Sequence, residues 1–214
     1  ETVDGFFTCS DWAADVVKKN PRIKFLDIVY PGLNSAFEPV DNKANHKKSV
    51  NLKEDDIVFG SVMRNMPRKL YPNIARTFGK LKKYLPEKIW KRCKLYWHCS
   101  YPDLAWNIPR LIIENDISRQ VYMTYKCQQC GAVFPSFFNG EERSCPRCPG
   151  IAKFPTSPFG ISQIDLAGIF NLFDCCVQYS TCEGFGRQQL EAGGCNVPVI
   201  TVDHSAMKDF INLG

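Results

Sequence analysis

A short segment near the end of the chain combines glycines and carboxylates in a spacing that suits phosphate binding. Glu183-Gly184-Phe185-Gly186 leads into a stretch with helical character, and Glu191 follows eight positions after Glu183. Glycine lets a backbone approach a bound anion closely. A helix that begins here would add unpaired N–H groups and a partial positive charge. The residue types therefore predict a phosphate-binding loop between two glutamates.

Four of the eleven cysteines have the spacing of a metal site. Cys127 and Cys130 form one Cys-x2-Cys pair, and Cys145 and Cys148 form a second, with fourteen residues between the pairs. Each pair presents two thiolates, and four thiolates close a tetrahedron around Zn²⁺. Four cysteines leave no open coordination position, so we expect the zinc to be structural. Residues 125–153 are therefore interpreted as a zinc ribbon, too small to fold without its metal.

The elements around the glycine segment indicate how it is positioned. Apolar runs at 175–179 and 197–200 are typical of buried strands. A strand, a glycine loop, a helix and a second strand place the helix N-terminus at the carboxyl edge of a parallel sheet. Further upstream the pattern predicts alternating strands and helices, with strands at 23–29, 57–59, 94–99 and 120–124 and helices at 11–19, 71–85, 107–114 and 162–173. The polar stretch 41–54 indicates a solvated loop.

The motifs in the last third of the chain resemble those of a known family. Glu-Gly-Phe-Gly at 183–186, Leu-Glu-Ala at 190–192 and Val-Pro-Val-Ile at 197–200 are similar to the signature of the retaining GT-B glycosyltransferases. This is the large glycogen-synthase-like group, also called group 1 or glycosyltransferase family 4. The resemblance implies an α/β fold, namely the Rossmann-like parallel-sheet C-terminal domain, which binds a nucleotide sugar and transfers the sugar with retention. Arg187 and Gln188 depart from the family, which has an apolar residue and a proline there.

The resemblance also implies roles for single residues. Glu183 would lie by the donor sugar, Glu191 would bind the nucleotide ribose, and the loop amides from Gly184 to Gly186 would hold the diphosphate. In the family an arginine and a lysine at this spacing neutralise that diphosphate, which implies Arg64 and Lys69 in this chain. Fixed cations suit this position because negative charge develops on the leaving diphosphate as the glycosidic bond breaks.

The resemblance extends to the domain organisation. Residues 30–39 are similar to the family's linker between its two Rossmann domains. Residues 1–30 would then be the tail of an N-terminal domain that is otherwise missing, and 31–124 with 154–214 would form the nucleotide-sugar-binding domain. We expect such a chain to transfer no sugar by itself, because the acceptor side comes largely from the missing domain. The ribbon follows the strand at 120–124, so we expect it to overhang the donor pocket or the acceptor route.

Composition limits the class of protein. The chain has 214 residues, is 44% hydrophobic and carries a net charge of +5, which fits an ordinary globular core. No apolar run approaches the ~18 residues that a membrane-spanning helix needs. The seven cysteines outside the ribbon are scattered, which favours reduced thiols in the cytoplasm over a disulfide framework. The partners expected are a nucleotide sugar and an acceptor, which is a glycan, a lipid, a protein or modified DNA.

A second interpretation rests on charge. Residues 64–94 hold eleven lysines and arginines against one acid, Glu87. Such a run can form a surface for nucleic acid or for an acidic partner. The chain would then be a zinc-ribbon binding module on a vestigial glycosyltransferase fold. No nucleic-acid motif accompanies the run, so we favour a solvated helix face.

Overall fold

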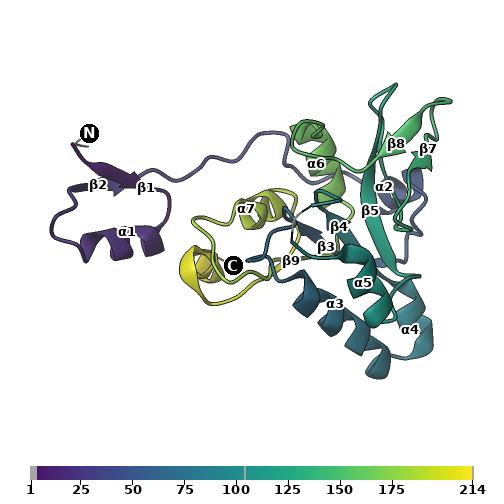
Figure 1. Cartoon of the computed structure of the whole chain (residues 1–214), viewed down its shortest axis with the longest axis horizontal. Coiled ribbons are helices and arrows are strands. Elements are labelled where there is room, and N and C mark those ends of the chain that lie inside the picture. Colours follow the sequence, from purple (N-terminus) through teal and green to yellow (C-terminus); the bar gives the residue numbers. More distant parts are fainter. Residues whose placement is uncertain (1–3, 104, 214) are drawn as a thin grey trace.

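The computed structural model describes residues 4–103 and 105–213, without the side chains of 211–213. A small N-terminal unit is joined to a larger one by an extended linker (Figure 1). The small unit consists of β1 (Phe6–Thr8), α1 (Asp11–Lys18) and β2 (Phe25–Ile28), and its two strands pair in parallel. Ser10 begins α1, since its Oγ accepts a hydrogen bond from the N–H of Ala13 at 3.2 Å.

The larger unit is built on one eight-stranded sheet. Its strands are β3 (Ile57–Val62), β4 (Cys93–His98), β5 (Val121–Cys127), β6 (Val133–Phe137), β7 (Arg143–Ser144), β8 (Ile151–Lys153), β9 (Cys175–Val177) and β10 (Val199–Ile200). They lie in the order β10-β9-β3-β4-β5-β8-β7, and β6 also pairs with β5. The strands from β10 to β5 pair in parallel, so their carboxyl ends meet at one edge of the sheet.

Helices cover both faces of this sheet (Figure 1). They are α2 (Lys43–Ser49), α3 (Tyr71–Lys80), η1 (Leu81–Lys83), α4 (Glu87–Arg92), α5 (Ile108–Glu114), α6 (Gln163–Phe170), α7 (Arg187–Gly194) and η2 (Ser205–Leu213). Side chains alternate between the two faces along a strand. In β4, Leu95 and Trp97 pack with α3 and α5, whereas Tyr96 packs with α6 and α7. This two-faced core confirms the Rossmann-like parallel sheet. No helix in the described ranges is long and apolar enough to cross a membrane.

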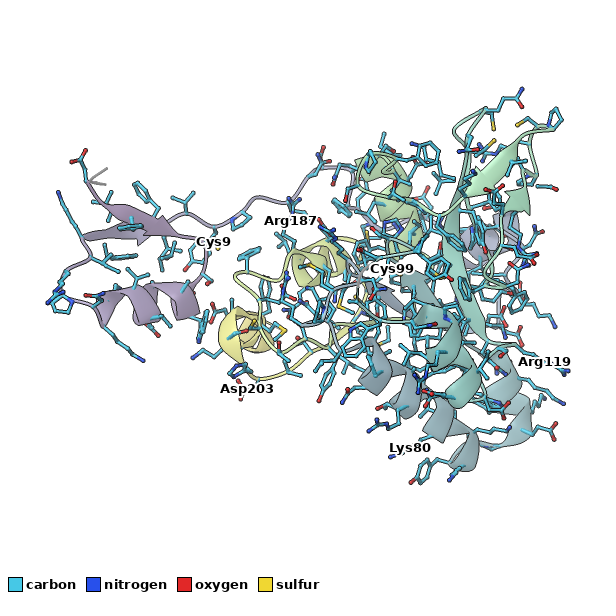
Figure 2. The ribbon with its side chains drawn as sticks, in the orientation of Figure 1. Cys9, Lys80, Cys99, Arg119, Arg187 and Asp203 are labelled. Carbon is cyan, nitrogen blue, oxygen red and sulfur yellow. The ribbon has the colours of Figure 1, made fainter. Side chains whose placement is uncertain are left out.

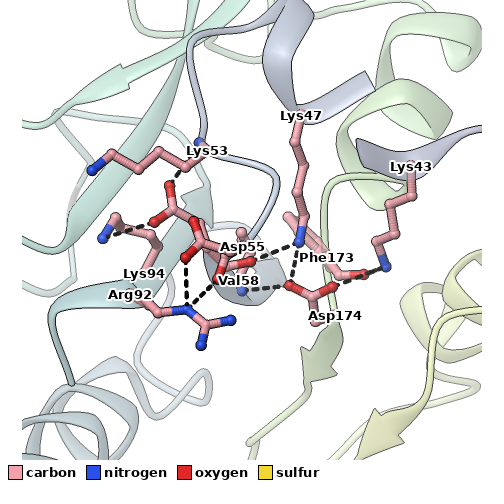
Figure 3. Close-up of polar contacts among 10 residues, drawn as sticks. Lys43, Lys47, Lys53, Asp55, Val58, Arg92, Lys94, Phe173 and Asp174 are labelled. Carbon is pink, nitrogen blue, oxygen red and sulfur yellow. Dashed lines mark hydrogen bonds and ion pairs between the residues drawn. The ribbon is translucent and has the colours of Figure 1, made fainter. Parts of the chain in front are cut away.

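The polar stretch at 41–54 is a helix and its connections, so the prediction of a solvated loop there is wrong. Lys47 of α2 is 3% exposed, and its Nζ donates to the Asp56 carbonyl at 2.7 Å and to Asp174 Oδ2 at 2.6 Å (Figure 3). The same carboxylate oxygen accepts from the N–H of Val58 at 2.8 Å. Lys47 therefore ties α2 to the amino ends of β3 and β9.

The inserted four-cysteine segment is continuous with the sheet. β6 pairs antiparallel with β5 from Tyr122 to Lys126, and β8 pairs with β5 at Lys126 and Cys127. Tyr122 has β4 on one side and β6 on the other, while Lys126 has β6 on one side and β8 on the other. β4 and β8 therefore lie on the same side of β5. The chain leaves the insertion through β8, which lies beyond the carboxyl end of β4, at the edge where the parallel strands end.

The small N-terminal unit contacts the larger one near the glycine segment. Cys9, labelled in Figure 2, donates from Sγ to the carbonyl of Gly184 at 3.3 Å. The N–H of Trp12 donates to Asp209 Oδ2 of η2 at 3.1 Å. The small unit therefore faces the predicted phosphate loop. The assignment of residues 1–30 to a separate domain stays a prediction.

Candidate functional site

The glycine segment connects β9 to α7 at the carboxyl edge of the sheet. Gly186 precedes α7 with a φ of 94°, a left-handed conformation that suits glycine. A Cβ at Gly186 would lie 2.7 Å from Nε2 of Gln189, so the position also lacks room for a side chain. In the described part of the chain, no side chain caps α7. The first N–H groups of this helix are thus free of a capping side chain, and with the helix dipole they favour an anion.

A buried carboxylate and two cations lie beside this loop. Glu183 pairs with the ammonium of Lys69, and one of its oxygens lies 3.9 Å from a guanidinium nitrogen of Arg68. The side chains of Lys69 and Glu183 are 10% and 9% exposed. Burial lowers the pKa of Lys69, and the bond to Glu183 opposes that shift. Two cations therefore share one carboxylate, that of Glu183, which directly precedes Gly184.

Backbone pairing explains how residues so far apart in sequence meet. The N–H of Thr181 donates to the carbonyl of Arg68 at 2.9 Å, and the N–H of Leu70 donates to the carbonyl of Tyr179 at 3.0 Å. The loop after β3 therefore runs along the loop after β9. Ser205 Oγ accepts from the N–H of Glu183 at 3.0 Å and fixes the other side of this loop.

The two cations that the sequence analysis proposed for the diphosphate have different partners, and their joint role stays a prediction: Lys69 pairs with Glu183 and Arg64 with Asp103. Arg64 lies at the end of β3, and its Nε donates to Asp103 Oδ2 at 3.3 Å. Its side chain is 57% exposed. Arg68, which the sequence analysis did not single out, lies beside Glu183. Its proximity follows from the backbone pairing of the two loops, for which the sequence offers no local signal.

Glu191 lies on α7, one helical turn beyond Arg187. Its carboxylate is 3.3 Å from the Arg187 guanidinium, and its side chain is 9% exposed. Burial raises the pKa of Glu191, and Arg187 counteracts the shift. Gln188, the departure from the family's proline, accepts from the N–H of Val62 through Oε1 at 3.0 Å. This bond ties the start of α7 to the carboxyl end of β3.

A cavity of about 270 Å³ opens at the carboxyl ends of β3 and β4. One wall comes from Val62 to Arg64 and another from His98 to Ser100. Pro155 to Ser157 and Gly160, which follow the four-cysteine insertion, line it as well. His98 forms a hydrogen bond through Nδ1 with Thr124 Oγ1 at 2.9 Å, and burial lowers the pKa of His98 to about 4. The cavity is therefore lined by a neutral imidazole, a guanidinium and hydroxyl groups.

The four cysteines of the insertion form a metal-ligand cluster. Their sulfur atoms all lie within 4.8 Å of one another. The Sγ atoms of Cys127 and Cys148 are 3.5 Å apart, and those of Cys130 and Cys145 are 3.6 Å apart. A tetrahedral zinc site with Zn–S bonds of about 2.3 Å requires sulfurs about 3.8 Å apart. The observed spacing fits that geometry.

Backbone groups support the cysteine cluster. The N–H groups of Gln129 and Cys130 each donate to Cys127 Sγ at 3.4 Å. The N–H of Arg147 donates to Cys145 Sγ at 3.3 Å. The bond from Cys130 contributes most to lowering the pKa of Cys127, to about 6. Donors of this kind stabilise thiolates, the form in which cysteine binds a metal.

No protein-family model matches the sequence, and no curated protein matches it. Solved structures do match. WaaG, a glycosyltransferase involved in lipopolysaccharide biosynthesis, aligns with a TM-score of 0.66 and 14% identity over 96% of this chain and 46% of its own. HepE from Anabaena, solved with UDP and glucose, aligns with a TM-score of 0.64 and 13% identity over 98% of this chain and 47% of its own. Sucrose-phosphate synthase from Thermosynechococcus elongatus aligns with a TM-score of 0.64 and 18% identity over 94% of this chain and 41% of its own.

The parallel sheet, with the glycine loop and the buried Lys69–Glu183 pair at its carboxyl edge, defines a Rossmann-like α/β domain. More particularly, the chain has the fold of the C-terminal domain of GT-B glycosyltransferases, with a four-cysteine cluster inserted. This confirms the fold that the sequence motifs predicted. The chain spans less than half the length of the three proteins compared.

Proposed function

We propose that the chain is the donor-binding domain of a retaining glycosyltransferase, which takes its sugar from a nucleotide sugar and releases a nucleoside diphosphate. One observation carries the proposal. Lys69, Arg68 and Glu183 converge beside the Gly184–Gly186 loop, in a fold shared with solved glycosyltransferases. A buried cation next to an uncapped helix N-terminus suits the charge that develops on a leaving diphosphate.

The proposed roles follow the contacts. Lys69 and Arg68 bind the diphosphate oxygens, together with the N–H groups at the start of α7. Glu183, held by Lys69 and by Ser205, stays beside the sugar. Glu191 accepts a hydrogen bond from a ribose hydroxyl, because its carboxylate lies on the next turn of α7. Arg64, which lines the cavity at the same strand ends, is the further cation proposed for the diphosphate.

The cavity at the ends of β3 and β4 receives the nucleoside end of the donor. It lies across β3 from the glycine loop, and Gln188 links the two through its bond to Val62. UDP and ADP are the first nucleotides to test, since the solved structures of HepE and of starch synthase IV contain them. The acceptor is a glycan, a lipid, a protein or modified DNA.

The four-cysteine cluster holds a structural zinc ion in this proposal. Four thiolates with the spacing of a tetrahedron fit Zn²⁺, and four protein ligands leave no position for a catalytic water. We propose a reducing location such as the cytoplasm, where zinc-binding thiolates and the seven other cysteines stay reduced. We expect the 214-residue chain to bind its donor without transferring the sugar, because it spans less than half the length of the solved transferases.

Calorimetry with UDP, ADP and GDP tests the proposal on the zinc-loaded chain. At least one of them should bind, and Glu191→Ala should weaken binding by about 1.5–3 kcal/mol through loss of a charged hydrogen bond. Glu87→Ala is the control, since Glu87 lies on α4 and pairs with Lys91 at the surface. If no nucleotide binds while nucleic acid binds tightly, the chain is the binding module of the second interpretation.

A further inference from the structure

The segment that follows the four-cysteine insertion forms part of the wall of the cavity at the ends of β3 and β4. Pro155, Thr156, Ser157 and Gly160 line it opposite residues from the two strand ends. Thr156 and Phe159 close this segment into a turn, with backbone hydrogen bonds in both directions at 3.3 and 3.0 Å. The turn is thus a compact unit, and its position depends on what holds it from outside.

Lys126 holds the far end of this turn. Its Nζ donates to the carbonyl of Gly160 at 2.6 Å and lies 4.5 Å from the centre of the Phe159 ring. Lys126 directly precedes Cys127, the first cysteine of the cluster. The Cys127 N–H donates to the Ala132 carbonyl at 2.8 Å, and β8 pairs with β5 at Lys126 and Cys127. The residue that holds the turn is therefore fixed by the metal-binding knuckle.

An aromatic cluster holds the near end of the turn. Phe154, next to Pro155, is 8% exposed and packs on Tyr125 of β5 with ring centres 4.5 Å apart. It also contacts Tyr101 at 5.1 Å and Phe138 at 5.5 Å. These rings come from the loop after β4, from β5 and from the insertion. The cavity wall and the insertion therefore share one small core.

We propose that the four-cysteine metal site and Lys126 together position the cavity wall, so that occupancy of the metal site controls affinity for the nucleoside part of the donor. The inference rests on the proposed function, and it makes Lys126 a positioning residue. With the metal bound, the knuckle fixes β5 and β8, and Lys126 holds Gly160 in place. Without it, four thiolates packed within 4.8 Å lose the cation that holds them together, and the wall loosens.

The test compares ligands that reach different parts of the site. UDP and ADP are titrated into the zinc-loaded chain, the chelator-treated chain and Lys126→Met, each alongside inorganic pyrophosphate. Lys126→Met should weaken the nucleotide that binds by about three- to tenfold, the value of one hydrogen bond. Metal removal should weaken it at least as much. Pyrophosphate, which reaches only the glycine loop and its cations, should bind as before in all three.

Lys153→Met is the matched control. Lys153 lies opposite Lys126 across β5 and β8 but pairs with Glu142 at 2.6 Å, outside the set of residues that line the cavity. It should leave both affinities unchanged, and Phe159→Ala should reproduce the effect of Lys126→Met. Zinc content and circular dichroism verify that the variants are folded.

Three results would overturn the inference. If nucleotide affinity is unchanged both by metal removal and by Lys126→Met, the wall is positioned by other groups. Equal losses for nucleotide and pyrophosphate would show a general disturbance of the domain. Binding of pyrophosphate alone by the wild-type chain would refute the proposed function itself, and the inference with it.

Discussion

Replacing Lys69 by methionine tests whether the buried cation of the site serves the donor diphosphate. Lys69 is 8% exposed, and its ammonium pairs with Glu183. Methionine nearly matches the length of the lysine stem, so the change removes the charge and keeps most of the packing. Affinity for a nucleoside diphosphate and stability of the fold should both fall, for different reasons.

The two effects have separate magnitudes. One hydrogen bond to a charged group contributes about 1.5–3 kcal/mol, so nucleotide affinity should fall by roughly 10- to 150-fold. Loss of Lys69 also removes the main partner of the buried Glu183 carboxylate. Among the ion pairs described, Arg68 at 3.9 Å is the cation that remains. Removing one partner of a buried pair costs about 3–5 kcal/mol, and we expect a cost near the lower value because Arg68 still compensates part of the charge.

Calorimetry measures the affinity, and thermal melts measure the stability. The double variant Lys69→Met/Glu183→Gln should regain most of the stability, because no uncompensated buried charge remains, while its affinity stays low. Lys80→Met is the control. Lys80 lies exposed at the outer end of α3, and its replacement changes the net charge by the same amount as Lys69→Met (Figure 2). Equal nucleotide affinity in the two lysine variants would refute a diphosphate role for Lys69.

Three further predictions concern the metal, the pH dependence and the fold. Metal analysis of the reduced chain should give one zinc per molecule, and Cys145→Ser should abolish it while circular dichroism retains most of the parent sheet's signal. Burial lowers the pKa of His98 to about 4 from 6.5, so the unfolded chain binds a proton that the folded chain excludes. The free energy of unfolding should therefore be unaffected above pH 6.5 and decrease by about 3 kcal/mol as the pH falls to 4, and His98→Gln should remove that decrease in thermal melts. Lys47→Met should lower the free energy of unfolding by roughly 1.5–3 kcal/mol in urea titrations, because it removes charged hydrogen bonds to Asp56 and Asp174; an unchanged midpoint would contradict this reading of α2.

The sequence predicted the elements whose signals are local. Continuous apolar runs located β4, β5 and β9, and the capping residues Ser10 and Ser162 located the starts of α1 and α6. Helix α2 was missed because its seven residues, Lys43–Ser49, carry no apolar stripe. What buries Lys47 is Asp174, 127 positions away, and no local pattern reports a partner at that distance.

The same distinction applies to the site. Glycines and glutamates at 183–191 could be recognised because they lie in one segment. The position of Arg68 beside Glu183 depends on how the loop after β3 pairs with the loop after β9, which no local pattern reports. The wall at 155–160 was also out of reach of sequence reasoning, because it depends on β8 pairing beside β5 beyond the end of β4.

The pairing of β6 with β5 has a consequence for how the chain tolerates excision. β6 covers β5 from Tyr122 to Lys126, and β5 belongs to the parallel core. Trimming residues 125–153 to obtain a minimal domain would leave β5 as a bare edge, with unpaired backbone groups next to apolar side chains. Such edges recruit strands from other molecules and cause aggregation. The insertion thus protects the edge of β5, and a shortened version of this domain should resist aggregation only if it keeps a strand in the place of β6.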